Sequence, residues 1–231
     1  MCGIVGYTGK KQAQKYLLDG LAALEYRGYD SAGLEVLSPD GQLHGVKCSG
    51  RVSTLVERCT TANLVGTQGI AHTRWATHGA PTDRNAHPHL DCSGRIAIVH
   101  NGIIENYREL RSYLMGEGHT FASDTDSEVV AHLIEDAWAG PAKGNLVAAV
   151  RNAISRLRGS WALAVESADA PGEIVVARKG SPLVVASTPD GAYAASDVMP
   201  LAAITSHVIN LDDGQLARLN PASYPHLRPQ E

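Results

Sequence analysis

The sequence predicts an α+β fold in which two antiparallel sheets pack face to face, with helices on the outside. The expected elements run as a strand, a helix, several strands, two helices and further strands, without the strict alternation of a parallel doubly wound sheet. Turn signals at Pro39-Asp40-Gly41 and Asp213-Gly214 indicate hairpins. With 231 residues, 44% of them hydrophobic, the chain can bury a core as one large domain or two small ones.

Hydrophobic spacing defines the individual elements. The run GIVGY is typical of a buried strand, whereas Leu17, Leu21 and Leu24 share one face of a helix that stops near Gly28. The apolar run RIAIVHNG predicts a strand ending in Asn101-Gly102, a pair suited to positive φ. The expected strands are 3–7, 32–38, 42–48, the start of 69–79, 95–102, 160–167, 173–179, 182–188, 192–197 and 208–219, and the expected helices are 12–28, 125–138 and 145–159.

Bulk properties exclude several classes of function. A formal net charge of −4 and the lack of a basic run argue against nucleic-acid binding. No apolar stretch approaches the ~18 residues of a membrane span, and the start MCGIVGYTGKK lacks the pattern of a secretory signal, so we expect a cytoplasmic protein. Of the four cysteines, Cys48, Cys59 and Cys92 are interpreted as small buried or half-buried residues.

Cys2 is unusual because it directly follows the initiator methionine. Once Met1 is removed, Cys2 carries a thiol with a reference pKa near ~8.5 and an α-amine near ~7.7–8.0. The amine can accept the thiol proton, as in other N-terminal nucleophiles. A cysteine fixed at the start of a buried strand would lie at the edge of a core. The position alone does not decide between a nucleophile and an accident of sequence.

Other residues have the types that amide chemistry needs. The Asn101 side chain and the Gly102 N–H are candidate donors to an oxyanion, although most Asn-Gly pairs are simply turns. Arg74 could bind a carboxylate through two parallel hydrogen bonds. Asp124 or Asp126, at a helix start, could cap the helix or bind an ammonium group.

Histidines gather in one stretch of the sequence, at His72, His78, His87 and His89. Their spacing matches no standard zinc motif, so we expect no metal and no other cofactor. A non-catalytic zinc-binding domain built on these histidines is an alternative from a different class of function. On sequence alone, Arg27 is interpreted as a solvated or structural cation.

Five blocks, CGIVGY, LEYRGYDSAG, GIAHTRWATHGAPTDRNAHPH, IVHNGIIENY and FASDTDSEVVAHLI, resemble the glutaminase domain of glucosamine-6-phosphate synthase, a class II glutamine amidotransferase. The resemblance runs from Cys2 to about Leu219. It implies the four-layer αββα sandwich of N-terminal-nucleophile hydrolases and the release of ammonia from L-glutamine without a cofactor.

The resemblance also implies roles for individual residues. Cys2 corresponds to the nucleophile, and Asn101 with Gly102 to the oxyanion hole. Arg74 corresponds to the residue that binds the glutamine α-carboxylate, and Asp126 to the one that binds the α-amine. The remaining matches are supporting ones: Thr77 and His78 beside the carboxylate site, Trp75 as a gate for ammonia, and Arg27 and His87 as local support.

The resemblance implies a glutaminase domain over 2–220, and the prolines of the last residues predict a loose C-terminal tail over 221–231. The sugar-phosphate isomerase region of the family is absent from this sequence, which is therefore expected to be an isolated domain or a fragment. The stretch from Trp75 to Asn85 is a candidate lid over the substrate. Two rivals stay open: the glutaminase domain of amidophosphoribosyltransferase, and an N-terminal-cysteine hydrolase for other amides.

Overall fold

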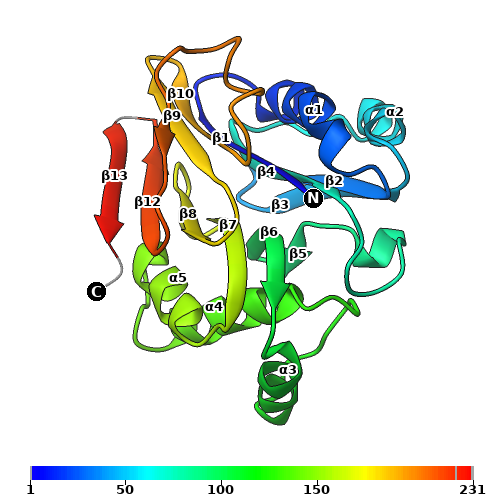
Figure 1. The fold of residues 1–231 in the computed structure, drawn as a ribbon, viewed down its shortest axis with the longest axis vertical. Coiled ribbons are helices and arrows are strands. Elements are labelled where there is room, and N and C mark those ends of the chain that lie inside the picture. The colour runs from blue at the N-terminus through cyan, green and yellow to red at the C-terminus, as the bar shows by residue number, and fades with distance from the viewer. Residues whose placement is uncertain (1, 222, 230–231) are drawn as a thin grey trace.

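The computed structural model describes residues 2–221 and 223–229, which form two antiparallel sheets covered by helices (Figure 1). The seven-stranded sheet has the order β11-β9-β10-β1-β4-β2-β3, and the six-stranded sheet has the order β13-β12-β8-β7-β6-β5. The first comprises β1 (Gly3–Gly9), β2 (Ser31–Leu37), β3 (Leu43–Ser49), β4 (Gln68–Arg74), β9 (Val184–Thr188), β10 (Gly191–Ala195) and β11 (Ile209–Asn210). The second comprises β5 (His89–Leu90), β6 (Ile96–Ile104), β7 (Gly159–Ser167), β8 (Ile174–Lys179), β12 (Gln215–Asn220) and β13 (Ser223–Pro229).

Helices cover the outer face of each sheet, which gives four layers (Figure 1). Those over the first sheet are α1 (Ala13–Leu24) and α2 (Val52–Ala62), and those below the second are α3 (Tyr107–Gly116), α4 (Glu128–Ala139) and α5 (Leu146–Ser155). Two short 3₁₀ helices, η1 (Glu25–Arg27) and η2 (Asp83–Asn85), lie in connecting segments. None of the helices in the described part of the chain is long and apolar enough to cross a bilayer.

The side chains of each central strand point alternately to its two faces, and they contribute to three hydrophobic cores. In β1, Ile4 belongs to the core between the two sheets, whereas Val5 belongs to the core beneath α1 and α2. In β6, Ala97 and Val99 face the other sheet, whereas Ile98 packs towards α4 and α5. Successive side chains of a strand point to opposite faces, so each central strand contributes to two layers. The predicted αββα sandwich is confirmed.

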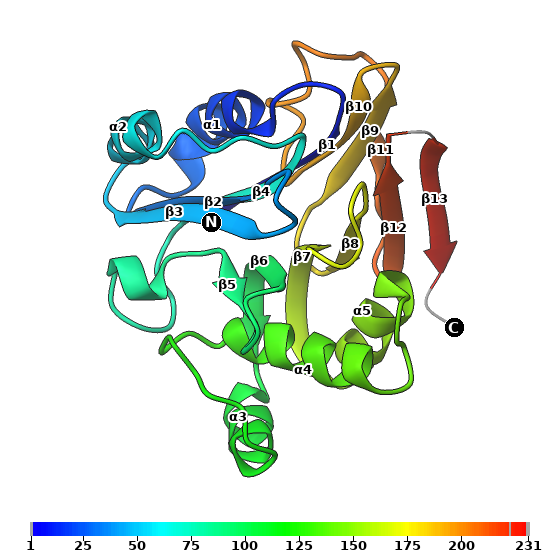
Figure 2. The same cartoon turned by 180° about the vertical axis from the view of Figure 1, so that it is seen from behind.

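Several segments differ from the sequence-based expectations. The Asp213-Gly214 turn does not form the expected hairpin, because it joins β11 to β12, and these strands lie in different sheets. Helices α2 and α3 were not expected; α3 buries only Leu110 and Leu114, so its apolar stripe is too narrow to stand out in the sequence. Residues 223–229, expected to be part of a loose tail, form β13, which pairs with β12 at the edge of the sheet (Figure 2). Prolines are tolerated there because an edge strand leaves one side of its backbone unpaired.

Candidate active site

Cys2 lies directly before β1, the central strand of its sheet. The antiparallel pairing of β1 with β4 sets Gly3 opposite Thr73, and this register brings Cys2 to the end of β4. The Cys2 Sγ accepts a hydrogen bond from the Trp75 N–H at 3.2 Å. Burial raises the pKa of the Cys2 thiol, while the Trp75 N–H acts in the opposite direction. The thiol is therefore protonated at neutral pH, and an attack by its sulfur needs a base.

Asn101 and Gly102 reach Cys2 from the other sheet. The Asn101 Nδ2 donates to the Cys2 carbonyl at 3.0 Å. His72 Nε2 lies 2.9 Å from Asn101 Oδ1 and 3.0 Å from the His100 carbonyl, and because both partners are acceptors, this nitrogen is the donor. Burial lowers the pKa of His72 to about 3, so the ring is neutral. His72 thus fixes which end of the Asn101 amide faces Cys2.

Gly102 has a backbone conformation that other residues rarely adopt. Its φ is +133°, and a Cβ at this position would overlap the Ser160 carbonyl on the neighbouring strand β7. The expected positive φ of the Asn-Gly pair is therefore present, inside the last part of β6.

Arg74, the last residue of β4, is only 4% exposed and uses its guanidinium to hold the loop that follows. Its Nη1 donates to the Ala80 carbonyl at 3.2 Å, and its Nη2 donates to the Gly79 carbonyl at 3.1 Å and to that of His78. The loop proposed from sequence as a lid is thus folded onto the same cation that was expected to bind a carboxylate.

Asp126 precedes α4 and is buried. Its Oδ2 accepts from the Ile104 N–H at 2.8 Å, at the end of β6. Its Oδ1 lies 3.4 Å from the Ser127 hydroxyl and 4.0 Å from His78 Nδ1. Both carboxylate oxygens therefore accept a hydrogen bond, but the one to Oδ1 is long, and this oxygen can still accept from a cation. Asp124, the other candidate, is exposed and pairs with Arg84 at 3.1 Å.

A small cavity of about 10 Å³ lies between Cys2, Gly102, Arg74 and Asp126, and Asn101 is not part of its lining. It has room for about one water molecule, so a substrate of amino-acid size requires the 75–85 loop to move. The cavity is lined by Cys2, Arg74, Trp75, Thr77, His87, His100, Gly102, Thr125, Asp126 and Ser127. Sequence reasoning gave no pocket role to His100, Thr125 or Ser127.

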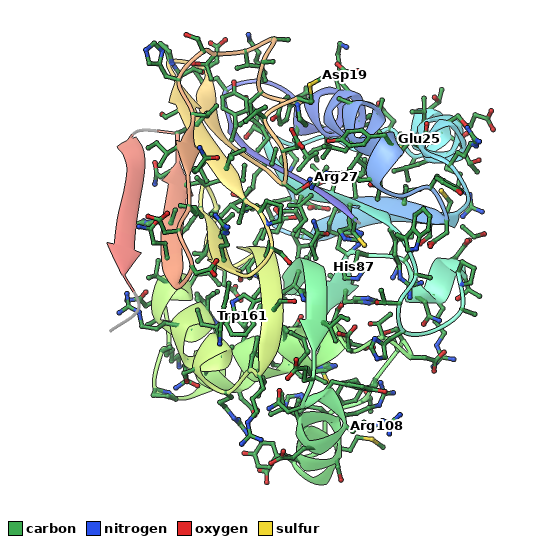
Figure 3. All side chains as sticks on the ribbon, in the orientation of Figure 1. Asp19, Glu25, Arg27, His87, Arg108 and Trp161 are labelled. Atoms are coloured by element: carbon green, nitrogen blue, oxygen red, sulfur yellow. The ribbon has the colours of Figure 1, made fainter. Side chains whose placement is uncertain are left out.

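Arg27 and His78 lie outside the cavity lining, whereas Trp75 is part of it. Arg27, in η1 after α1, donates to the Ser196 carbonyl at 3.0 Å, so it supports the start of β1 rather than lining the pocket (Figure 3). The Ser196 hydroxyl accepts from Ile4 N–H at 3.0 Å, which completes that support. His78 does not line the cavity, and the Trp75 side chain is half exposed.

His87 lies in the segment before β5, where Figure 3 labels it, and it packs against the strand that carries Asn101. Its Nδ1 accepts from the His100 N–H at 3.3 Å, and its ring stacks on His72 with centroids 4.2 Å apart. Burial, with the neighbouring His72 and His89, holds the pKa of His87 well below its usual range. Three of the four histidines that suggested a metal site, His72, His87 and His89, are therefore neutral rings packed against one another, and they support the pocket.

His72 is the main positioning residue that sequence reasoning missed. Its link to Asn101 joins β4 to β6, two strands of different sheets, and no local motif reports such a contact. Asp30 is a second: its carboxylate accepts from the Ala76 N–H and holds the first turn of the 75–85 loop.

Comparison with known proteins places these observations in a family. The chain is 50% identical over 227 residues to a glutamine–fructose-6-phosphate aminotransferase (isomerizing) from Chlorobaculum tepidum, and 52% identical over 219 residues to one from Thermus thermophilus. These alignments cover 97% and 95% of this chain, but only 37% and 35% of the relatives. The chain therefore spans little more than a third of the curated relatives it matches.

Solved structures share the fold. Glutamine phosphoribosylpyrophosphate amidotransferase from B. subtilis superimposes with a TM-score of 0.83 at 24% identity, covering all of this chain and 49% of that one. A glutamine aminotransferase class-II domain protein from Silicibacter pomeroyi superimposes with a TM-score of 0.67 at 15% identity, over 99% of both chains. The model of the glutamine amidotransferase domain family matches residues 72–203, and the chain belongs to that family.

Proposed function

We propose that this chain hydrolyses the side-chain amide of L-glutamine to glutamate and ammonia, with Cys2 as the nucleophile. The observation that carries the proposal is the position of Cys2 at the start of a central strand, with its carbonyl bonded to the Asn101 amide. The two sheets thereby bring the Cys2 sulfur close to Asn101, and this supports the proposed roles of nucleophile and oxyanion donor.

The proposed reaction starts from a chain whose Met1 has been removed. The free α-amine of Cys2 takes the thiol proton, directly or through one water, and the sulfur attacks the glutamine amide carbon. Asn101 Nδ2 and the Gly102 N–H stabilise the negative oxygen of the tetrahedral intermediate. The protonated amine then donates to the departing nitrogen, which leaves as ammonia. Water hydrolyses the remaining thioester and releases glutamate. Every group in these steps comes from the chain or the solvent, so the proposed reaction uses no cofactor.

Two charged side chains support an amino-acid substrate. Arg74 offers its guanidinium to the α-carboxylate, and Asp126 offers Oδ1, the more weakly bonded of its two oxygens, to the α-ammonium group. Thr77 lines the cavity beside Arg74, and His78 lies near Asp126. The Arg74 guanidinium must release its hydrogen bonds to the loop carbonyls before it can bind the substrate carboxylate. We therefore propose that the 75–85 loop opens and recloses in each cycle.

For the protein as a whole, we propose the ammonia-supplying half of a glucosamine-6-phosphate synthase, in amino sugar biosynthesis. The relatives that carry this name are about half identical to the chain, and this supports the assignment over an amidophosphoribosyltransferase. The partner would be a sugar-phosphate isomerase region, and Trp75 would gate the passage of ammonia towards it. We propose a cytoplasmic location, because the free thiols of Cys48 and Cys59 suit a reducing compartment.

The test is ammonia and glutamate release from L-glutamine by the purified chain, compared with Cys2→Ala. We expect turnover in the first and none in the second, with glutamine binding kept in Cys2→Ala. Two other amides serve as matched substrates: asparagine, whose side chain is one methylene shorter, and a glutamine analogue that lacks the α-amine. Both should react poorly. Equal rates with conjugated amides that lack the amino-acid charges would favour a hydrolase of another specificity, and near-wild-type turnover by Cys2→Ala would refute the nucleophile.

A further inference from the structure

A second cluster of metal-binding side chains lies away from Cys2, between α4 and two loops. It consists of Cys92 after β5, His119 after α3, and His132 and Glu135 on α4. One ligand atom from each lies within 4.8 Å of the others. Within residues 2–221 and 223–229, this is the one group of three or more such side chains, and it contains none of the histidines behind the pocket.

Four of the six distances between these atoms are 3.0–3.5 Å, close to those of a tetrahedral site. Cys92 Sγ lies 3.5 Å from His119 Nδ1 and 3.5 Å from His132 Nδ1. Glu135 Oε2 lies 3.0 Å from the first of these nitrogens and 3.1 Å from the second. A tetrahedral zinc ion with bonds of about 2.3 Å to sulfur and about 2.0–2.1 Å to nitrogen and oxygen sets its ligands about 3.3–3.6 Å apart.

The outer nitrogens of both rings face carboxylates. His119 Nε2 is 2.8 Å from Asp136 Oδ1, and His132 Nε2 faces Glu128 Oε1 at 3.7 Å. Histidines that bind a metal through one nitrogen usually donate the other N–H to a carboxylate, which fixes the tautomer.

Access and support for an ion are both present. Cys92 is exposed, not buried or half-buried as the sequence suggested, while the His132 side chain is 1% exposed. The Thr120 N–H lies 3.5 Å from Cys92 Sγ, where it can stabilise a thiolate. The site therefore has an open side for entry and a fixed inner side.

We propose that Cys92, His119, His132 and Glu135 bind one zinc ion as a structural site. Sulfur, two imidazole nitrogens and one carboxylate oxygen are a ligand set that zinc accepts, and four protein ligands leave no open position for catalysis. The ion ties the loop after β5 and the loop after α3 to α4. Because Asp126 and Ser127 directly precede α4, the ion also braces one wall of the pocket. This departs from the expectation that the chain binds no metal.

The test uses the purified chain after chelation, reloaded with Zn²⁺ or with Co²⁺ as a spectroscopic probe. We expect about one ion per chain, and a sulfur-to-cobalt charge-transfer band that disappears in Cys92→Ser. Asp136→Asn keeps all four ligands and should weaken affinity about 10–100-fold. Zinc should raise the Tm of the wild type but not that of Cys92→Ser.

Two control variants locate the ion. His44→Ala removes an exposed histidine that pairs with Asp40, and Cys2→Ala removes the other accessible thiol; both should keep the ion and the band. Failure of the reloaded wild type to retain an ion, persistence of the band in Cys92→Ser, or its loss in Cys2→Ala would each overturn the proposal. None of these measurements depends on glutaminase activity.

Discussion

Substitution of Asn101 by alanine separates a catalytic role of this residue from a structural one. The Asn101 amide donates to the Cys2 carbonyl at 3.0 Å and accepts from His72 at 2.9 Å. At about 0.5–1.5 kcal/mol for each hydrogen bond, Asn101→Ala should lower the free energy of unfolding by about 1–3 kcal/mol. The loss is limited because His72 keeps its hydrogen bond to the His100 carbonyl.

The expected effect on catalysis is larger than the effect on stability. Loss of one oxyanion donor costs about 10²–10³ in kcat, or about 3–4 kcal/mol of transition-state stabilisation. The assay is ammonia release at saturating glutamine, at a temperature where thermal unfolding shows the variant to be fully folded. Activity within tenfold of the wild type under those conditions would refute the role assigned to Asn101.

Asn106 offers a matched control. Its side chain donates to the Arg156 carbonyl at 2.9 Å and accepts from the Arg158 N–H at 2.8 Å. Asn106→Ala therefore removes the same two kinds of hydrogen bond outside the pocket. It should lower stability by a similar amount and leave kcat within a few-fold of the wild type. An equal loss of activity in both variants would contradict the reasoning.

Three further substitutions test separate parts of the account. Arg74→Ala should raise KM by at least about 30-fold, or ~2 kcal/mol, because it removes the cation proposed to bind the carboxylate; an unchanged KM would place that site elsewhere. Gly102→Ala should lower both stability and kcat, because its Cβ would overlap the Ser160 carbonyl, whereas Gly94→Ala, at a positive φ with open space, should lower stability by about 1 kcal/mol without changing kcat. Burial raises the pKa of Glu35 from 4.5 to about 7, so its contribution to stability is fully present below pH 4.5 and is lost as the pH rises through about 7. Relative to Glu35→Gln, the wild type should lose about 3 kcal/mol between pH 4.5 and pH 8.5 in chemical denaturation, and parallel pH profiles for the two proteins would contradict this.

The fold was predictable from the sequence because its signals are local. Apolar runs separated by turn residues predicted most of the strands, and their order along the chain predicted two antiparallel sheets. Helix α2 escaped notice because it buries only Val52, Leu55 and Cys59 among polar and β-branched residues. Strand β13 escaped notice because proline normally argues against a strand, and only its position at the sheet edge makes it tolerable.

The candidate site was only partly predictable. Cys2, Asn101 and Asp126 stand in short motifs that the sequence displays directly. The residues that position them do not stand in such motifs. His72, for example, contacts Asn101 only because the two sheets pack face to face. The ligands of the proposed zinc site come from three separate segments, and the only local pattern among them is the spacing of His132 and Glu135 on one helix face. Contacts between sheets and between loops depend on tertiary packing, which sequence periodicity does not report.

The central claim is that Cys2, with its own free amine, attacks the glutamine amide. The most direct measurement is mass spectrometry of the intact and digested protein after treatment with a glutamine analogue that carries an electrophile in place of the amide. The account predicts a single adduct on the sulfur of Cys2, formed only in molecules that lack Met1 and prevented by excess glutamine. An adduct on Cys48, Cys59 or Cys92, or equal labelling of molecules that keep Met1, would contradict it.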